Sequence, residues 1–323
     1  MITLSKIAKE AHVSVSTASK AFSGSAEVNE DTRNRIFDVA KRYGCFKKFF
    51  NATYSKYVIA VICPEFSSNH YCSYLSYLRR ALDKEGCEIC VAESNFSPEK
   101  EKELLDYYCM HADVDAIIVI DFQTNTYDFH EIPILFMGCA PNSIGRISIV
   151  TDISGTVTEC VDYLVSRGVS SIGFIGEPLT NHKLSVLQDT LSKQELVLDD
   201  AHIRISQQRF EAGGYEAMEA MLNAAPPPRA VICAYDNMAI GAMKCIADHG
   251  LRIPEDIAVL GMDGIPNAPY LIPPLASISA QTEECCRLAV RTVIRQINGQ
   301  AVPVSQTIPA KLQLRESFMI PSP

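Results

Sequence analysis

A short segment near the start of the chain carries small polar side chains on one face and apolar side chains on the other. Residues 15–22 read VSTASKAF, in which Ala18, Ala21 and Phe22 recur at the i, i+3, i+4 spacing of a buried helix face. The small, hydrogen-bonding face would let this helix approach another surface closely, and the major groove of DNA is one surface that accepts a helix. A merely solvated face is the alternative. The side chains on this face are Val15, Ser16, Thr17, Ser19 and Lys20.

Aspartates form a second set of candidate residues, each at the end of an apolar run. Asp121 ends DAIIVID, Asp152 follows ISIVT, Asp236 ends RAVICAYD and Asp263 ends IAVLGMD. A carboxylate can accept hydrogen bonds from two vicinal hydroxyls, which is the chemistry of sugar recognition. Side chains at such positions face the crevice outside the carboxyl ends of parallel strands. Capping is the alternative for two of them: Asp236 suits the start of a helix at Asn237, and Asp121 suits a loop.

Three helices are predicted in the first 45 residues. Leu4, Ile7 and Ala8 repeat with helical spacing before the VSTASKAF segment, and the pair is typical of a helix-turn-helix whose second helix reads DNA. The third helix begins after Asn29 and ends at Gly44. Its predicted buried face consists of Ile36, Val39, Ala40 and Tyr43. The side chains suited to cap the three helices are Thr3, Ser14 and Asn29.

The charge of the chain divides between its start and the rest. The net charge is −9, yet residues 1–56 carry ten Lys and Arg against five Asp and Glu. The remaining residues carry 19 basic and 33 acidic side chains. A basic head on an acidic body predicts that only the head meets phosphates, because the body would repel DNA.

Twelve cysteines are spread along the chain. Cys63, Cys139 and Cys233 lie in or beside apolar runs, where cysteine packs as a small hydrophobic side chain. Cys87 and Cys90 form a C-x-x-C motif without a second pair at zinc spacing, so we predict neither a metal site nor a cofactor. Met1 leads directly into the first helix, and no apolar run is long enough to span a membrane. We therefore expect a reduced, cytoplasmic protein with no membrane partner.

From residue 57 onward, apolar runs alternate with amphipathic helical segments. YVIAVICP, DAIIVID, SSIGFIGE and IAVLGMD are typical of buried strands, and PEKEKELLDYYCM and NMAIGAMKCIADHG are typical of helices. Strands that are apolar throughout and separated by helices predict parallel sheets covered on both faces. There are too many runs for one modest sheet. We therefore predict an α/β body of two Rossmann-like lobes behind the all-α head.

Longer motifs in both parts carry a family resemblance. The head reads TLSKIAKEAHVSVSTASKAF and then VNEDTRNRIFDVAKRYG. The body contains CAYDNMAIGAMKCIADHGLRIPEDIAVLGMDGIPNAPYLIPPLASI. In content and order these segments resemble the LacI/GalR family of bacterial transcription regulators over almost the whole chain. The resemblance implies a body similar to periplasmic sugar-binding proteins, with two lobes, a ligand between them and three chain crossings at a hinge.

The resemblance also implies a division of the chain. We expect a helix-turn-helix DNA-binding domain at 1–45, a hinge or connector at 46–56, and a ligand-binding and dimerisation domain at 57–323. The last domain would comprise an N-lobe at about 57–152 and 282–309 and a C-lobe at about 153–281 and 310–323.

In the head, Val15, Ser16 and Lys20 occupy the positions with which the resembled family reads bases. Val15 could contact a thymine methyl, and Ser16 can hydrogen-bond any base edge. Lys20 stands where the family often has Arg, and it lacks the planar fork of Arg. The other candidate DNA-binding residues, suited mainly to phosphates, are Thr3, Ser5, Thr17, Ser19, Asn29 and Thr32. For Thr3 and Asn29, capping alone is the alternative.

In the body, the resemblance implies a pocket between the lobes. Tyr71 aligns with a family aromatic and could stack on a ring face, and Lys183, in TNHKLSVL, aligns with the family's pocket Arg. A solvated lysine at a helix start is the alternative for Lys183. The full set of candidate ligand-binding residues is Tyr71, Asp121, Asp152, Lys183, Tyr235, Asp236 and Asp263. Arg209 and Glu211, in RFEAGGY, could also help to line the cleft.

The connector departs from the resembled family. Its hinge usually reads YxPNxxARxL, with a leucine that wedges into the minor groove, whereas this chain has CFKKFFNATY and is several residues shorter. Phe49, Phe50 or Tyr54 could act as the wedge, since apolar side chains can intercalate at a base step. Packing of these rings on the body is the alternative.

These observations together predict a ligand-responsive, DNA-binding transcription regulator rather than an enzyme. We expect a repressor that binds pseudo-palindromic operator DNA as a homodimer and senses a small polyhydroxylated effector, such as a sugar or sugar derivative. The alternatives are a sugar-binding protein, or a Rossmann-like enzyme without operator-specific binding. Against the enzyme, no phosphate-binding glycine motif, nucleophile elbow or zinc-protease motif follows a suitable strand.

Overall fold

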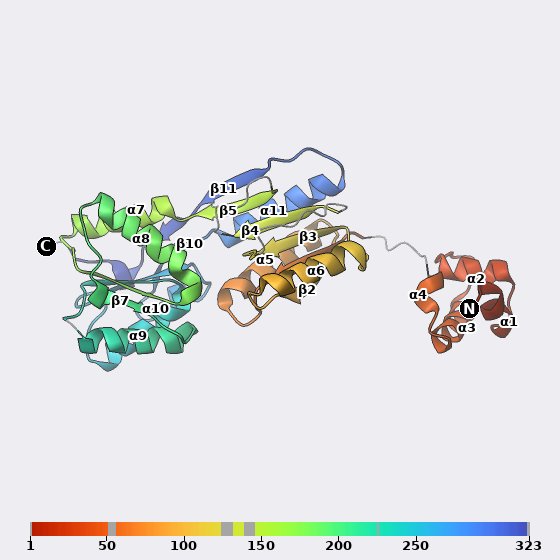
Figure 1. Cartoon of the computed structure of the whole chain (residues 1–323), viewed down its shortest axis with the longest axis horizontal. Helices are drawn as coiled ribbons and strands as arrows, with labels where there is room; N and C mark the ends of the chain where they lie inside the picture. The colour runs from red at the N-terminus through yellow and green to blue at the C-terminus, as the bar shows by residue number, and fades with distance from the viewer. Residues whose placement is uncertain (1, 51–55, 124–131, 139–145, 225, 322–323) are drawn as a thin grey trace. The chain divides into compact units, whose positions relative to one another are not determined.

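The computed structural model describes residues 2–50, 56–123, 132–138, 146–224 and 226–321. The chain divides into two compact units, Met1–Tyr57 and Val58–Pro323, called here the head and the body (Figure 1). Tyr54 and Cys139, singled out in the sequence, lie outside the described residues.

Three helices form the head, as the sequence predicts: α1 (Leu4–Glu10), α2 (Val15–Phe22) and α3 (Glu30–Arg42). Each predicted cap is confirmed. The side-chain oxygens of Thr3, Ser14 and Asn29 accept hydrogen bonds from the third backbone N–H beyond them, at 3.3, 3.0 and 2.8 Å. These bonds satisfy N–H groups that a helix start leaves unpaired.

The core of the head follows the predicted faces with one exception. It consists of side chains from all three helices, including Ile7, Ala8, Ala18, Ala21, Phe22, Ile36, Val39 and Ala40. Tyr43 was predicted to be buried with them, and this is wrong. It is 37% exposed, and its hydroxyl donates to the carboxylate of Glu10. Tyr43 follows the last helical residue, where the backbone leaves the face that Ile36 and Val39 share.

The first part of the connector belongs to the head. Phe46–Phe49 form a short helix, α4, and Phe46 and Phe49 pack against the head core. The ring centroids of Phe22 and Phe49 lie 5.8 Å apart, and those of Phe46 and Phe50 lie 5.0 Å apart in a stacked pair. Phe49 and Phe50 thus contact other aromatic rings of the head.

One six-stranded sheet forms the N-lobe of the body, in the order β11-β5-β4-β3-β1-β2 (Figure 1). Its strands are β1 (Val58–Cys63), β2 (Glu88–Glu93), β3 (Ala116–Ile120), β4 (Ile134–Gly138), β5 (Ser148–Asp152) and β11 (Ser305–Pro309). All are parallel. Helices α5 (Asn69–Lys84) and α11 (Thr282–Ile297) bury one face, and α6 (Pro98–Met110) buries the other.

A second six-stranded sheet forms the C-lobe, in the order β12-β10-β9-β8-β6-β7. Its strands are β6 (Ile172–Gly176), β7 (Ile203–Ile205), β8 (Ala230–Cys233), β9 (Ala258–Asp263), β10 (Ala276–Ser279) and β12 (Lys311–Gln313). Only β12 pairs antiparallel. The main helices are α7 (Ser154–Ser166), α8 (Asn181–Lys193), α9 (Phe210–Ala224) and α10 (Asp236–Asp248). The predicted α/β body with two parallel-sheet lobes is confirmed.

The chain passes between the lobes after β5, after β10 and after β11. These passages lie close together: the N–H of Ala310 donates to the carbonyl of Asp152 at 2.8 Å, and the side-chain amide of Gln281 donates to the carbonyl of Pro309 at 2.5 Å. Three adjacent crossings are a geometry that allows hinge motion.

The described residues were compared with the predictions about cysteines, metal binding and membrane spans. Every cysteine among the described residues is a free thiol, and Cys63 and Cys233 are buried as predicted. Over the same residues, no three His, Cys, Asp or Glu side chains gather at metal-binding distance. No helix in this part of the chain has both the length and the apolar character needed to cross a membrane.

Candidate functional sites

The outer face of α2 presents the predicted reading residues to solvent. Val15 is 47% exposed although it is apolar, and Ser16, Ser19 and Lys20 are exposed as well. Thr17 is half-buried, and its hydroxyl bonds with that of Ser14 at 2.8 Å. The ammonium of Lys20 forms an ion pair with Glu27. An exposed apolar residue among small polar ones fits contact with a partner.

The other candidate DNA-binding residues lie near helix starts of the head. Thr3 and Asn29 cap α1 and α3 and are also exposed, so capping leaves their side chains accessible. Ser5 is exposed on α1, and Thr32 is half-buried in the first turn of α3. Backbone N–H groups at such helix starts suit phosphate oxygens.

A cavity of about 450 Å³ lies between the two lobes of the body. This volume falls in the usual range of small-molecule sites. Its walls come from the carboxyl ends of strands in both sheets, where sequence reasoning placed the ligand. The lining residues at these strand ends are Glu65, Asp121 and Gly138 from the N-lobe, Ile153 at the crossing after β5, and Glu177, Tyr235, Asp263 and Ala280 from the C-lobe.

Five of the seven predicted ligand-binding residues line this cavity, and two do not. Those that line it are Tyr71, Asp121, Lys183, Tyr235 and Asp263. They come from both lobes and span nearly two hundred residues of sequence. The structure therefore brings most of the predicted set together, while Asp152 and Asp236 lie elsewhere.

Lys183, on α8, is held inside the cavity by two acceptors. Its ammonium donates to the carbonyl of Ala234 at 2.6 Å and lies 3.4 Å from an oxygen of Asp263. Its side chain is only 12% exposed. A solvated lysine is therefore not what the structure shows.

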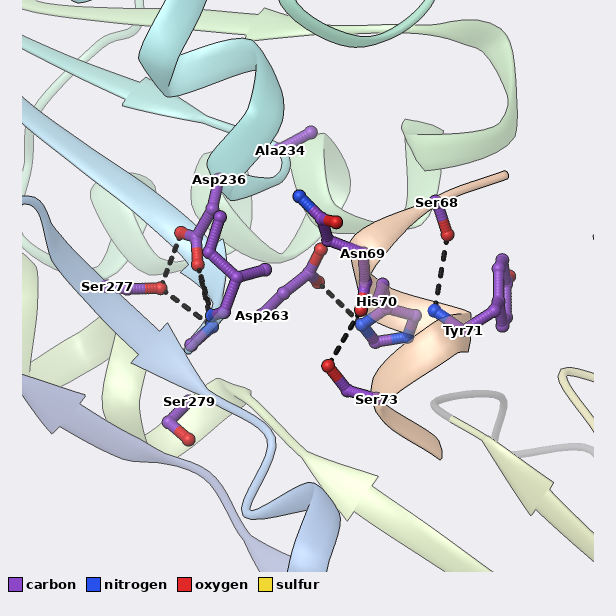
Figure 2. A network of polar contacts seen from close by, with 12 residues as sticks. Ser68, Asn69, His70, Tyr71, Ser73, Ala234, Asp236, Asp263, Ser277 and Ser279 are labelled. Carbon is purple, nitrogen blue, oxygen red and sulfur yellow. Dashed lines mark hydrogen bonds and ion pairs between the residues drawn. The ribbon is translucent and has the colours of Figure 1, made fainter. Parts of the chain in front are cut away.

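Asp263 also contacts His70, on α5 of the N-lobe. The Nδ1 atom of His70 lies 3.4 Å from the Asp263 carboxylate, so this contact joins the two lobes (Figure 2). His70 also lines the cavity, although it is not among the predicted ligand-binding residues. No local pattern could have identified it, because its partner lies almost two hundred residues away.

Tyr71 and Asp121 form the polar contact of the N-lobe wall. The hydroxyl of Tyr71 donates to Asp121 at 2.8 Å. Burial, together with the nearby Asp121 charge, raises the pKa of Tyr71 well above its usual value. Gly138 is required beside this pair, because a Cβ atom there would lie 2.5 Å from an Asp121 oxygen. A side chain at position 138 would therefore displace the Asp121 carboxylate from the cavity wall.

The pKa of His182, in the first turn of α8, is shifted by burial and by a neighbouring cation. Burial and the charge of Lys183 lower the pKa of His182, and Asp121 opposes this shift. His182 lines the cavity, and the lowered pKa favours its neutral form. It adds one donor or acceptor without adding charge.

Asp236 does not line the cavity, and its predicted capping role is wrong. The helix begins at Asp236 itself, so its side chain does not cap it. The carboxylate is fully buried and accepts from Ser277 Oγ at 2.6 Å and from the N–H groups of Gly264 and Ile265 at 2.9 and 2.8 Å (Figure 2). Burial and the nearby Asp263 raise its pKa. Asp236 therefore holds the loop after β9 in place.

Asp152 lies at a hinge crossing rather than in the cavity. Its side chain is exposed and accepts from the N–H of Ser154 at 2.9 Å. Its carbonyl accepts from Ala310. The strand end points this carboxylate at the start of α7, which explains why the sequence signal was misleading.

Arg209 lines the cavity, whereas Glu211 does not. Each nitrogen of the Arg209 guanidinium donates to a carboxylate: Nη1 and Nη2 to Glu65, at 2.6 and 3.0 Å, and Nε to both oxygens of Glu177, at 3.0 and 3.1 Å. Glu211 instead accepts from the side-chain amide of Asn237 at 2.5 Å. Sequence reasoning missed Glu65 and Glu177, although both follow apolar runs in the same way as the aspartates.

Two family descriptions match the chain. Residues 3–44 match "Bacterial regulatory proteins, lacI family", and residues 161–318 match "Periplasmic binding protein-like domain". The transcriptional regulator AscG of Escherichia coli (strain K12) is 26% identical over 337 aligned positions, which cover 100% of both chains. The chain belongs to the LacI family of bacterial regulatory proteins.

Solved structures of two other regulators share this fold. A CelR–cellobiose complex has a TM-score of 0.70 at 23% identity, covering 98% of this chain and 100% of that chain. A lac repressor dimer bound to operator has a TM-score of 0.70 at 21% identity, covering 98% and 99%.

The LacI-family assignment confirms the predicted class of protein. The relatives are transcriptional regulators and not enzymes, so the chain is a transcriptional regulator. The alternatives of a transport-type binding protein and a Rossmann-like enzyme are therefore set aside.

Proposed function

We propose that this LacI-family regulator binds pseudo-palindromic operator DNA through its head and represses transcription until a small polyhydroxylated effector occupies the interlobe cavity. The observation that carries the proposal is a cavity lined by strand ends of both lobes in a chain that also carries a helix-turn-helix head. A ligand there can change the relation of the lobes, and only such a differential interaction can shift a conformational equilibrium.

The charges of the cavity support a neutral effector. Both cationic side chains on the described wall are already bonded to carboxylates, Lys183 to Asp263 and Arg209 to Glu65 and Glu177. The carboxylate of Asp121 accepts a hydrogen bond from the Tyr71 hydroxyl, and among the described residues its remaining lone pairs leave acceptor capacity for ligand hydroxyls. Aromatic rings on the wall, among them Phe96, Phe122 and Phe210, suit the apolar face of a sugar ring. The CelR structure holds cellobiose, a neutral sugar.

Readout by α2 is supported by its exposed face. Val15, Ser16 and Lys20 are accessible while the opposite face fills the head core. We assign base contacts to these three residues and phosphate contacts to the remaining head candidates Thr3, Ser5, Thr17, Ser19, Asn29 and Thr32.

A homodimer is supported by an exposed apolar loop on the C-lobe. Tyr270 is 84% exposed and Ile272 is 97% exposed, an unusual state for two large apolar side chains so close in sequence. The related lac repressor structure is a dimer on its operator. A dimer would present two heads to half-sites about one helical turn apart, roughly 34–36 Å. An effector that shifts the lobes by little could then prevent both heads from docking.

The division into domains is part of the proposal. We place the DNA-binding function in 1–45, the connector in 46–56 and effector binding and dimerisation in 57–323. The separate compact units support the boundary between the connector and the effector-binding domain, and the membership of the two sheets supports the proposed lobes.

Selection of DNA sequences by the full chain, followed by gel-shift titration, tests the proposal. We expect a pseudo-palindromic site whose binding weakens when a neutral mono- or disaccharide that raises the thermal midpoint of the protein is added. The double variant Ser16→Ala/Lys20→Ala should lose about 1–3 kcal/mol per base contact. Lys9→Ala, an exposed basic residue on α1, is the control. Failure of the full chain to select any sequence, with or without sugars, would overturn the proposal.

A further inference from the structure

Arg209 spans the boundary between the lobes. It lies immediately before α9 of the C-lobe, and its Nη1 and Nη2 atoms donate to the two oxygens of Glu65, which follows β1 of the N-lobe. The pair is bidentate, the strongest geometry available to an arginine and a carboxylate. Its Nε atom donates to Glu177 of its own lobe.

Aromatic rings from both lobes cover the guanidinium. Its carbon lies 5.1 Å from the ring centroid of Phe96, in the N-lobe, and 4.7 Å from that of Phe210, in the C-lobe. A guanidinium at this distance from a ring face gains a cation–π attraction. Charge and stacking therefore both connect the lobes through this one side chain.

The two carboxylates are deeply buried. Glu65 is 6% exposed and Glu177 is 3% exposed. Separation of the lobes would break the Glu65–Arg209 ion pair, whereas Glu177 would keep Arg209. Opening therefore costs the two charge-assisted hydrogen bonds of this bidentate pair. The Glu65–Arg209 pair thus favours the arrangement in which the lobes enclose the cavity.

Glu177 has a different part in the arrangement, because it holds Arg209 in position. The N–H of Glu177 donates to Thr180 Oγ1 at 2.9 Å, and the Thr180 hydroxyl donates back to the Glu177 carbonyl at 2.8 Å. This fixes the backbone that carries the Glu177 carboxylate. Glu177 consequently orients the Arg209 guanidinium so that Nη1 and Nη2 face the N-lobe.

We propose that Glu65 and Arg209 are positioning residues that form a clasp between the lobes, and that this clasp sets how readily the body closes on its effector. The inference rests on the proposed effector cavity. If only the enclosed arrangement binds effector tightly, the apparent Kd equals the intrinsic Kd divided by the enclosed fraction. The clasp would then set effector sensitivity through the fraction of molecules in the enclosed arrangement.

Amide hydrogen exchange of the full chain, with no sugar or DNA added, tests the clasp directly. In Glu65→Gln, which keeps the shape of the side chain, we expect the backbone amides of residues 65–70 and 206–212 to exchange about tenfold faster, because the buried pair no longer opposes opening. Small-angle scattering should show a wider separation of mass within the body. Asp256→Asn, which removes an Arg–carboxylate pair inside the C-lobe, is the control and should leave both regions unchanged.

A double-variant cycle separates the clasp from independent effects. The effects of Glu65→Gln and Arg209→Gln on exchange should not multiply in the double variant Glu65→Gln/Arg209→Gln, since both substitutions remove the same interaction. Thermal unfolding identifies any variant that fails to fold, in which case Glu65→Asp, with a shortened side chain, replaces it. Unchanged exchange in Glu65→Gln, or multiplicative effects of the two substitutions, would overturn the inference. Because no effector or operator is used, this result is independent of whether the proposed function holds.

Discussion

The head and the interlobe cavity carry their candidate residues in opposite states. On the head, Val15, Ser16 and Ser19 are exposed and project from one helix. In the cavity, Lys183, Asp263 and Tyr71 are already bonded to other residues of the protein. A surface that must meet a long, charged partner stays open, whereas a site for a small molecule is built from groups that position one another before binding.

The largest expected effect is a loss of stability in the head alone, with the body unchanged. Phe22→Ala should remove about 3–5 kcal/mol from the stability of the head, because the ring fills the core and contacts two rings of the connector. Scanning calorimetry should show a head transition at lower temperature and an unchanged body transition. A common shift of both transitions would show that the two units do not unfold separately.

Asp236→Ala tests the positioning of groups in the body. Ser277 and two backbone N–H groups would lose their buried acceptor, at a cost of about 2–3 kcal/mol. Urea unfolding of the body should show the loss. Asp189→Asn, at an exposed position on α8, is the control. A change below 0.5 kcal/mol, roughly the level of ordinary surface substitutions, would contradict the assigned role.

Asp121→Asn sharpens the contrast by acting on effector binding alone. Hydrogen bonds to a charged acceptor contribute about 1.5–3 kcal/mol, so the affinity for a sugar found by screening should fall about 10- to 150-fold. Operator binding without sugar should stay the same, as measured by gel shift. Weakened operator binding in the absence of sugar would instead assign Asp121 a structural part in the body.

The smallest expected effect concerns alkaline pH. The pKa of Tyr71 is raised in the folded protein, so the unfolded chain loses this proton first. The stabilisation is present below the usual tyrosine pKa of about 10 and declines as pH rises above it. Tyr71→Phe should therefore lose less stability than the natural chain between pH 9 and pH 11, by about 1 kcal/mol. Parallel curves for the two proteins would contradict the shift.

The sequence predicted the head more completely than the cavity for a physical reason. Caps and helix faces are set by residues three or four positions apart, so Thr3, Ser14 and Asn29 could each be assigned locally. The fold of the body also followed from local patterns of apolar runs. The cavity instead depends on which strand ends meet, and its residues lie far apart in the chain.

Strand-end carboxylates show the limit of that reasoning. Asp121 and Asp263 follow strands and line the cavity, whereas Asp236 binds a neighbouring loop and Asp152 lies at a crossing. The direction that the chain takes after each strand decides between these outcomes. This direction cannot be predicted from the pattern of residue types. Glu65 carried the same signal and was overlooked because only aspartates were considered.

The short helix α4 has a consequence for chimeric regulators. Phe46 and Phe49 contribute rings to the packing around Phe22, so they belong to the head as a transferable module. A fusion that joins this head to another sensor body should retain the chain through Phe50. A junction at residue 45 would remove the rings that pack on Phe22 and Phe37. The DNA-binding head of such a fusion would then fold poorly.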